Sequence, residues 1–160
     1  MAQRSAGILA YRRLGGELEV FLVHPGGPYW RRKDAGAWMI PKGEIMPGEE
    51  ELTAALREFQ EETGVSLEAR FHPLGEVRQA GGKHVIVWAA QADIDAAVIV
   101  SMTFEMEWPP RSGRKQIFPE VDRAAWFDLA RAREYVLPSQ RPFLDRLEEA
   151  VNSGALSRMS

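Results

Sequence analysis

The chain has 160 residues with a net charge of −3, and 45% of the residues are hydrophobic, as in ordinary globular domains. The small negative charge gives no general attraction to nucleic acid or anionic membrane. The absence of cysteine excludes disulfides and thiolate chemistry. No apolar run predicts a signal peptide or a membrane span, so we expect a cytoplasmic protein with no membrane partner.

The first third of the chain predicts a β-hairpin. Residues 5–12 form the first strand, with Ala6, Ile8 and Ala10 on one face. Residues 18–24 form the second strand, whose continuous apolar centre indicates burial on both faces. Turn glycines at positions 15 and 16 join the two strands.

A loop over residues 29–36 follows the hairpin and combines aromatic with cationic side chains. Trp30, Arg31 and Lys33 are candidate substrate-binding residues, because aromatic rings stack on bases and cations contact phosphate oxygens. An ordinary solvated loop is the alternative. Trp38, at the start of a predicted short strand over residues 38–41, is a further candidate for substrate binding.

The stretch 43–65 predicts a loop followed by a helix and a glycine that ends the helix. Pro47 and Gly48 mark the loop, and glutamates follow where a helix first turn favours them. Gly64 is placed to cap the carboxyl end of the helix in a left-handed conformation. The apolar face of this helix comprises Leu52, Ala55, Leu56, Phe59 and Thr63.

Acidic side chains occupy another stripe of the same helix. Glu58 and Glu62 are four residues apart, Glu61 lies beside them, and Arg57 is close enough to pair with one of these acids. Clustered carboxylates invite a hard divalent cation that cancels their repulsion. A solvated acidic helix face is the alternative.

Two more strands, over residues 69–79 and 84–92, predict a second hairpin. Residues 93–101 read either as a strand or as a buried connection, and the apolar part of this segment would pack on the core or on a partner subunit. A homodimer is therefore one of the expectations.

Residues 102–113 begin as an extended segment and break at two prolines. Glu105 or Glu107 would face a metal or solvent, and solvent is favoured. Arg111 and Lys115 belong to a small basic cluster that either clamps phosphates or lies in a surface loop.

The chain ends with a predicted strand over residues 120–128, a short helix over 129–133 and a final helix capped by Ser139 and running to about residue 151. Strands before and after one central helix predict an α/β (α+β) fold, an α/β/α sandwich with a mixed sheet between helices. We expect one domain over residues 1–151 and a flexible tail over residues 152–160.

The spacing in 43–65 resembles the Nudix box, G-x5-E-x7-R-E-U-x-E-E-x-G-U, where U is a bulky apolar residue. All of its specified positions match, including Gly43, Glu49, Arg57 and Gly64. Segments outside the box are similar to a bacterial Nudix subgroup related to diadenosine polyphosphate hydrolases. The resemblance implies the sandwich fold and a Mg²⁺-dependent hydrolase that splits a phosphoanhydride in a nucleoside diphosphate derivative, with Mn²⁺ as a substitute ion.

The resemblance also implies roles for individual residues. Glu58 and Glu62 would be the core metal ligands, with Glu61 a ligand or the general base. The Gly43 carbonyl would join the coordination sphere, Lys42 would contact phosphate, and Arg57 would hold a glutamate, most favourably Glu49.

Three substrate classes compete: dinucleoside polyphosphates such as diadenosine tetraphosphate, (deoxy)nucleoside triphosphates including damaged ones, and nucleotide sugars or ADP-ribose. The basic loops and tryptophans favour the first class. A nucleotide-binding regulator without catalysis is the non-enzyme alternative, and an RNA-end pyrophosphohydrolase is disfavoured because the sequence shows no extended basic surface.

Overall fold

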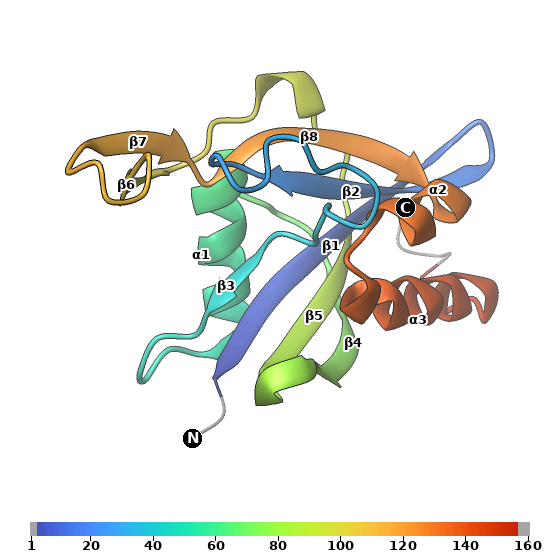
Figure 1. Ribbon diagram of the computed structural model, residues 1–160. Helices are drawn as coiled ribbons and strands as arrows, with labels where there is room; N and C mark the ends of the chain where they lie inside the picture. The colour runs from blue at the N-terminus through green and yellow to red at the C-terminus, as the bar shows by residue number, and fades with distance from the viewer. Residues whose placement is uncertain (1–2, 157–160) are drawn as a thin grey trace.

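A six-stranded mixed sheet forms the centre of the computed structural model, which describes residues 3–156 (Figure 1). Its strand order is β4-β5-β1-β2-β8, and β3 pairs with β1 beside this path. Strand β1 pairs parallel with β5 and antiparallel with β2, so the predicted mixed sheet is confirmed. The strands of the protein are β1 (Arg4–Leu14), β2 (Glu17–Pro25), β3 (Lys42–Glu44), β4 (Phe71–Arg78), β5 (His84–Gln91), β6 (Thr103–Glu107), β7 (Lys115–Pro119) and β8 (Val121–Asp128).

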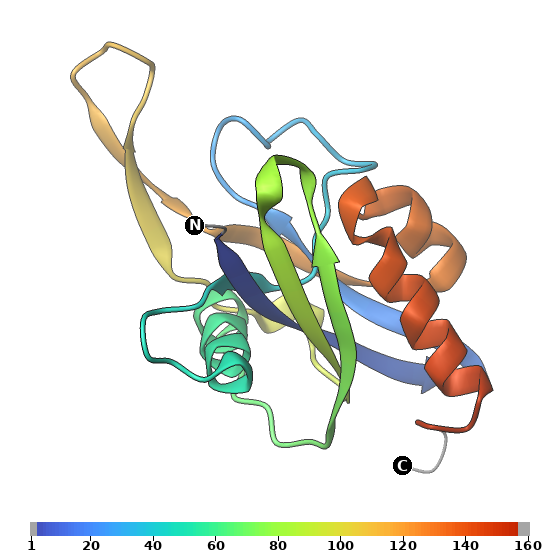
Figure 2. The same ribbon diagram turned by 90° about the horizontal axis from the view of Figure 1, so that it is seen from below.

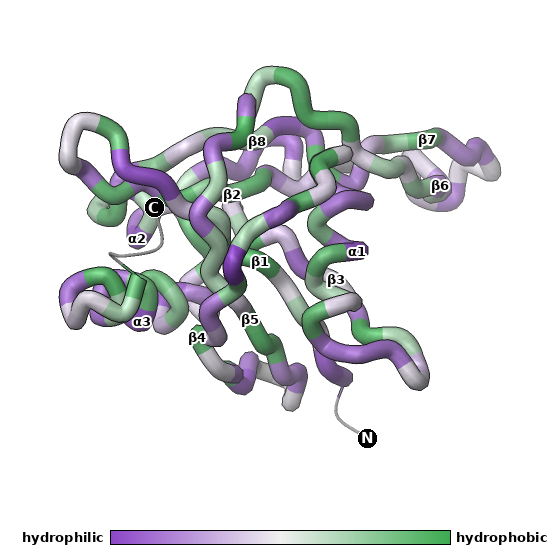
Figure 3. The backbone as a smooth tube through the Cα atoms, turned by 180° about the vertical axis from the view of Figure 1, so that it is seen from behind, coloured by the Kyte–Doolittle hydropathy of each residue, from purple (hydrophilic) through white to green (hydrophobic). Residues whose placement is uncertain are grey.

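Helices cover both faces of the sheet. Figure 1 shows α1 on one side and α3 on the other, as the sandwich prediction requires. The tube in Figure 3 alternates between hydrophilic and hydrophobic residues along α3, because only one side of this helix faces the core. The helices are α1 (Glu51–Thr63), α2 (Leu129–Tyr135) and α3 (Arg141–Asn152), with short 3₁₀ turns at Ala80–Gly82, Ala96–Val98 and Pro138–Gln140.

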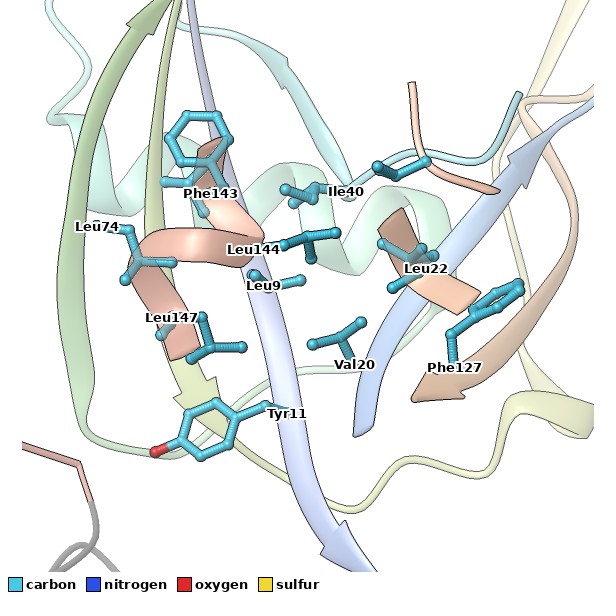
Figure 4. Packing of buried hydrophobic residues seen from close by; sticks show 14 of the residues in the cluster. Leu9, Tyr11, Val20, Leu22, Ile40, Leu74, Phe127, Phe143, Leu144 and Leu147 are labelled. Carbon is cyan, nitrogen blue, oxygen red and sulfur yellow. The ribbon is translucent and has the colours of Figure 1, made fainter. Parts of the chain in front are cut away.

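Two apolar clusters lie on opposite faces of the sheet. Successive residues of a strand point to opposite faces, so Ile8 joins the cluster under α1 whereas Leu9 joins the cluster under α3. Figure 4 shows Leu144 and Leu147 of α3 packed over this second cluster. Strand β2 contributes to both clusters, which confirms its predicted burial on both faces.

A two-stranded sheet, β6 with β7, stands apart from the main sheet, and Figure 2 shows this hairpin extending away from the body of the protein. The residues between β5 and β6, for which the sequence allowed two alternatives, contain a 3₁₀ turn and no strand. Ile94 is buried, whereas Val98 and Val100 are 67% and 71% exposed. The homodimer stays a prediction. Within residues 3–156, no helix combines the length and apolar character needed to cross a bilayer.

Two local predictions are wrong. The strand expected over residues 38–41 is displaced to β3, and positions 38 and 39 make only isolated bridges. Pro41 lacks an N–H, so it cannot donate to a neighbouring strand. Its carbonyl accepts from the Ile8 N–H. Ser139 does not cap α3: its hydroxyl accepts from the Gln79 amide at 3.1 Å. The N-cap of α3 is Gln140, whose side chain makes no cap hydrogen bond and turns inward to the Ile40 N–H.

The carboxyl end of the described chain packs on the domain. Leu156 is 2% exposed and belongs to the cluster under α3. Residues 157–160 of the predicted tail lie outside the described residues. The domain boundary at residue 151 therefore stays a prediction.

Candidate active site

Helix α1 and strand β3 hold the predicted metal-binding residues against each other. Gly43 pairs with Ala6 of β1, and a Cβ added at Gly43 would overlap the Glu58 carboxyl group. Only a glycine lets this carboxylate rest on the main chain of β3. The main chain of Gly43 and the carboxylate of Glu58 therefore lie next to each other, as the motif predicts.

Arg57 organises the acidic side chains around the start of this site. Its Nε and Nη2 donate to the two carboxylate oxygens of Glu49 at 2.8 and 3.0 Å, which is a bidentate pair and confirms the predicted partner. Its Nη1 donates to Glu58 at 2.8 Å and to Glu61 at 3.1 Å. Its Nη2 also donates to the Glu44 carbonyl, so one guanidinium links the loop before α1 to the acidic stripe of the helix.

Glu62 is the most enclosed of the acids, at 6% exposed. Burial, followed by the negative charge of Glu58, raises the pKa of Glu62 to about 8. Burial also raises the pKa of Glu58, against the opposing effect of Arg57. Two neighbouring carboxylates that resist ionisation alone are stabilised as anions by a cation between them.

A fourth carboxylate joins the group from outside the motif. Glu120, between β7 and β8, is close enough to Glu61 that partial desolvation and the charge of Glu61 raise its pKa, and its charge also raises the pKa of Glu58 and of Glu62. Glu120 is not among the residues predicted from the sequence, because no fixed spacing connects it to α1 and no local pattern marks it.

These groups fit a hard divalent ion, since they are carboxylate and carbonyl oxygens, the ligands that magnesium prefers. In the described part of the chain, no three acidic or histidine side chains converge closely enough to hold an ion as they stand. Arg57 meanwhile contacts both Glu58 and Glu61. The ligand assignments therefore remain predictions.

Lys42 carries a cation close to the acids. Burial lowers its pKa, and the positive charge of Lys83 lowers it further, whereas Glu62 and Glu58 oppose this change. Lys83 lies in the turn before β5 and is not among the residues predicted from the sequence. The contact of Lys42 with phosphate stays a prediction.

Backbone hydrogen bonds connect two other segments to this region. The carbonyl of Glu61, near the carboxyl end of α1, accepts from the Met102 N–H at the base of the β6–β7 hairpin. The carbonyl of Glu120 accepts from the Gly26 N–H, shortly before the predicted substrate loop. Tyr29 and Trp108 meet edge to face at 5.2 Å, which brings the loop and the hairpin together.

The predicted substrate residues fall on these two segments. Trp30 is partly exposed, with the Lys33 ammonium 5.0 Å from its ring centre, and Arg31 is exposed. Arg111 and Lys115 are exposed on the β6–β7 hairpin, where Lys115 pairs with Glu105 at 3.6 Å.

Trp38 is a correction to the predicted set. It is 5% exposed and lies in the core, its Nε1 donates to Asp34 at 2.8 Å, and its ring meets Phe127 edge to face. A ring enclosed in this way does not present a face to a base. A tryptophan next to a basic loop can lie either in the core or in a substrate site, so the sequence does not distinguish these two placements.

The protein is an α/β/α sandwich, and its carboxylates lie along α1 beside Gly43 of β3. The 43–65 motif implies this fold and this kind of site. The chain belongs to the NUDIX domain family, whose family model matches residues 1–147. The resemblance drawn from the motif is thereby confirmed.

Individual relatives give a narrower comparison. The chain is 37% identical over 68 residues to the asymmetrical bis(5'-nucleosyl)-tetraphosphatase of Caenorhabditis elegans, covering 42% of this chain and 45% of the relative. It is 41% identical over 71 residues to the Rattus norvegicus enzyme of the same name, covering 40% and 48%. The chain thus spans about half the length of these curated relatives.

Solved structures share the fold over nearly the whole chain. The C. elegans Ap4A hydrolase binary complex superposes with a TM-score of 0.67 at 22% identity, covering 93% of this chain and 98% of the other. The NUDIX domain of Shewanella oneidensis NrtR, complexed with ADP ribose, gives a TM-score of 0.65 at 18% identity, covering 94% and 89%. At these identities the likeness concerns the fold alone.

Proposed function

We propose that this protein is a Mg²⁺-dependent pyrophosphohydrolase that cleaves a phosphoanhydride bond in a dinucleoside polyphosphate such as diadenosine tetraphosphate. The observation that carries the proposal is the packing of the Glu58 carboxyl group against Gly43, with Glu61, Glu62 and Glu120 near enough to take part in the electrostatics of this group. The tetraphosphatase relatives support this substrate class.

The residues divide the chemistry between them. Glu58, Glu62 and the Gly43 carbonyl would hold magnesium, which when bound neutralises charge on the phosphate oxygens. The oxygen of the attacking water forms a bond to phosphorus while its proton passes to a carboxylate oxygen of Glu61 or Glu120, and the bond from phosphorus to the leaving phosphate oxygen breaks.

Arg57 and the lysines position the other participants. Arg57 holds Glu49, Glu58 and Glu61 in one arrangement, so the carboxylates need little reorganisation when substrate arrives. Lys42 offers a positive charge at the edge of the cluster. Mn²⁺, an ion that also accepts oxygen ligands, would substitute for Mg²⁺.

A substrate panel with product separation by chromatography tests the proposal. With Mg²⁺, diadenosine tetraphosphate should yield ATP and AMP, the products of asymmetric cleavage. Glu58→Gln should lower turnover by about 100-fold or more while its circular dichroism and melting transition stay native-like. Glu149→Gln, an exposed change on α3, is the matched control. A folded wild-type protein that binds nucleotide but hydrolyses nothing would support the regulator instead.

An RNA-end pyrophosphohydrolase is the second candidate. The chain is 59% identical over 34 residues to the RNA pyrophosphohydrolase of Erythrobacter litoralis, covering 21% of each chain. RNA with a 5' triphosphate therefore belongs in the panel, beside deoxynucleoside triphosphates and ADP-ribose. Faster release of pyrophosphate from RNA than of ATP from diadenosine tetraphosphate would favour this candidate.

A further inference from the structure

His24 is a fully buried histidine near the end of β2, and the acidic cluster does not include it. A buried imidazole is stable only when its ring nitrogens have hydrogen-bond partners. Nε2 lies 2.6 Å from the carbonyl oxygen of Lys33, and Nδ1 lies 2.8 Å from a carboxylate oxygen of Asp122. The edge of Trp38 packs against the ring at 5.3 Å, so the ring orientation is fixed on every side.

The nature of these partners determines where the hydrogens are. A carbonyl oxygen only accepts, so Nε2 carries a hydrogen. Nδ1 lies at hydrogen-bond distance from an Asp122 carboxylate oxygen, so this nitrogen has a partner of its own. His24 therefore makes two separate connections, and no side chain with a single donor reproduces both.

The first connection holds the substrate loop. Lys33 lies in the segment that carries Trp30 and Arg31, and its ammonium sits near the Trp30 ring. The bond from His24 fixes the main chain at Lys33. The bond therefore restrains the main chain of the loop that carries Trp30, Arg31 and Lys33.

The second connection holds the strand end beside the acids. The pairing of β2 with β8 shifts between His24 and Pro25, so Asp122 is the extra residue of a bulge. Glu120 lies two residues earlier, and its carbonyl accepts from the Gly26 N–H at 2.9 Å. Asp122 is thus two residues from Glu120, the acid whose pKa the charge of Glu61 helps to raise.

We propose that His24 is a positioning residue with two arms, an inference that rests on the proposed hydrolase function. The arm through the Lys33 carbonyl holds the substrate loop and serves binding. The arm through Asp122 holds the strand end that carries Glu120 near the acids and serves the chemical step.

Two amide substitutions separate the arms, because asparagine and glutamine each retain one donor of histidine. The amide nitrogen of glutamine replaces Nε2, so His24→Gln keeps the Lys33 bond and loses the Asp122 bond. The amide nitrogen of asparagine replaces Nδ1, so His24→Asn has the opposite effect. We expect His24→Gln to lower kcat by about tenfold with KM little changed, and His24→Asn to raise KM by about tenfold with kcat little changed.

Asp122→Ala provides a second variant that leaves the buried ring in place. The Asp122 side chain is 34% exposed, so its truncation leaves no cavity in the core, and its kinetic profile should match that of His24→Gln. His72→Gln, on β4, is the matched histidine control and should behave like wild type. A purely structural His24 would lower the melting temperature and the folded fraction in both variants, with no split between KM and kcat per folded molecule.

Amide hydrogen exchange provides a readout that does not depend on activity. Exchange at the Gly26 N–H, which bonds the Glu120 carbonyl, should accelerate in His24→Gln and Asp122→Ala. Exchange within residues 29–36 should accelerate in His24→Asn. If the wild type hydrolyses nothing in the panel, the proposed function fails. The exchange pattern still tests whether His24 holds the loop and the strand end through separate hydrogen bonds. Wild-type exchange in all three variants, or the same kinetic change in both His24 variants, would overturn the inference.

Discussion

Replacing Glu62 by glutamine should stabilise the metal-free protein at alkaline pH, although it removes a predicted ligand. Burial and Glu58 raise the pKa of Glu62 from 4.5 to about 8. The folded state therefore holds this proton more tightly than the unfolded state does. The resulting contribution to stability is complete below pH 4.5 and is lost as pH rises through about 8.

The size of the effect follows from the same interval. At about 1.4 kcal/mol for each pH unit, the metal-free wild type loses at most about 5 kcal/mol between pH 4.5 and pH 8 from this group. Glutamine has the same shape and does not titrate. Glu62→Gln should therefore equal wild type near pH 5 and exceed it by several kcal/mol near pH 8, with a flatter dependence on pH.

Urea unfolding in EDTA from pH 5 to pH 8.5 measures this difference, and Glu149→Gln on the exposed face of α3 serves as control. Added Mg²⁺ should reverse the ranking at pH 8, because the ion binds the ionised carboxylate of the wild type and has lost a ligand in the variant. Equal pH dependence in wild type and variant, or a variant that is less stable at pH 8 in EDTA, would refute the reasoning.

Three further substitutions test separate parts of the site and the fold. Arg57→Lys removes the bidentate pair with Glu49 and should cost about 1 to 3 kcal/mol in urea unfolding, together with a loss of Mg²⁺-dependent turnover; a fully active variant would contradict the organising role. Gly43→Ala places a methyl group where the Glu58 carboxyl lies. It should abolish turnover while the protein stays folded, as steady-state kinetics and thermal melts on one preparation would show. Ser139→Ala should change stability by less than about 0.5 kcal/mol, since Ser139 does not cap α3. A loss near 1 kcal/mol would instead indicate that Ser139 caps this helix.

The parts of the site that could be predicted from the sequence are those encoded by local spacing. Residues three and four apart in a helix meet by geometry alone, so the helical repeat was enough to place Arg57, Glu58, Glu61 and Glu62 on one stripe. The pairing of Arg57 with Glu49 needed only a short loop in addition. The sheet and its two helical layers followed from the order of the strand and helix patterns.

The remainder depends on contacts between distant segments, which periodicity does not encode. His24 and Asp122 are 98 residues apart, and they meet because of a bulge in one strand pair. Glu120 lies near the acids of α1 although about sixty residues separate it from that helix in the sequence. Trp38 was misassigned because its burial depends on Phe127, in a strand far along the chain.

The four bonds of Arg57 to acids and its bond to the Glu44 carbonyl also bear on how the proposed ion would bind. One end of the guanidinium is anchored to Glu49, while Nη1 already supplies positive charge to Glu58 and Glu61. Ion binding would then exchange one cation for another rather than fill an uncompensated anionic site. The arginine would keep the acidic side chains in order before the ion arrives, and the binding energy of the ion would be reduced by the arginine contacts given up.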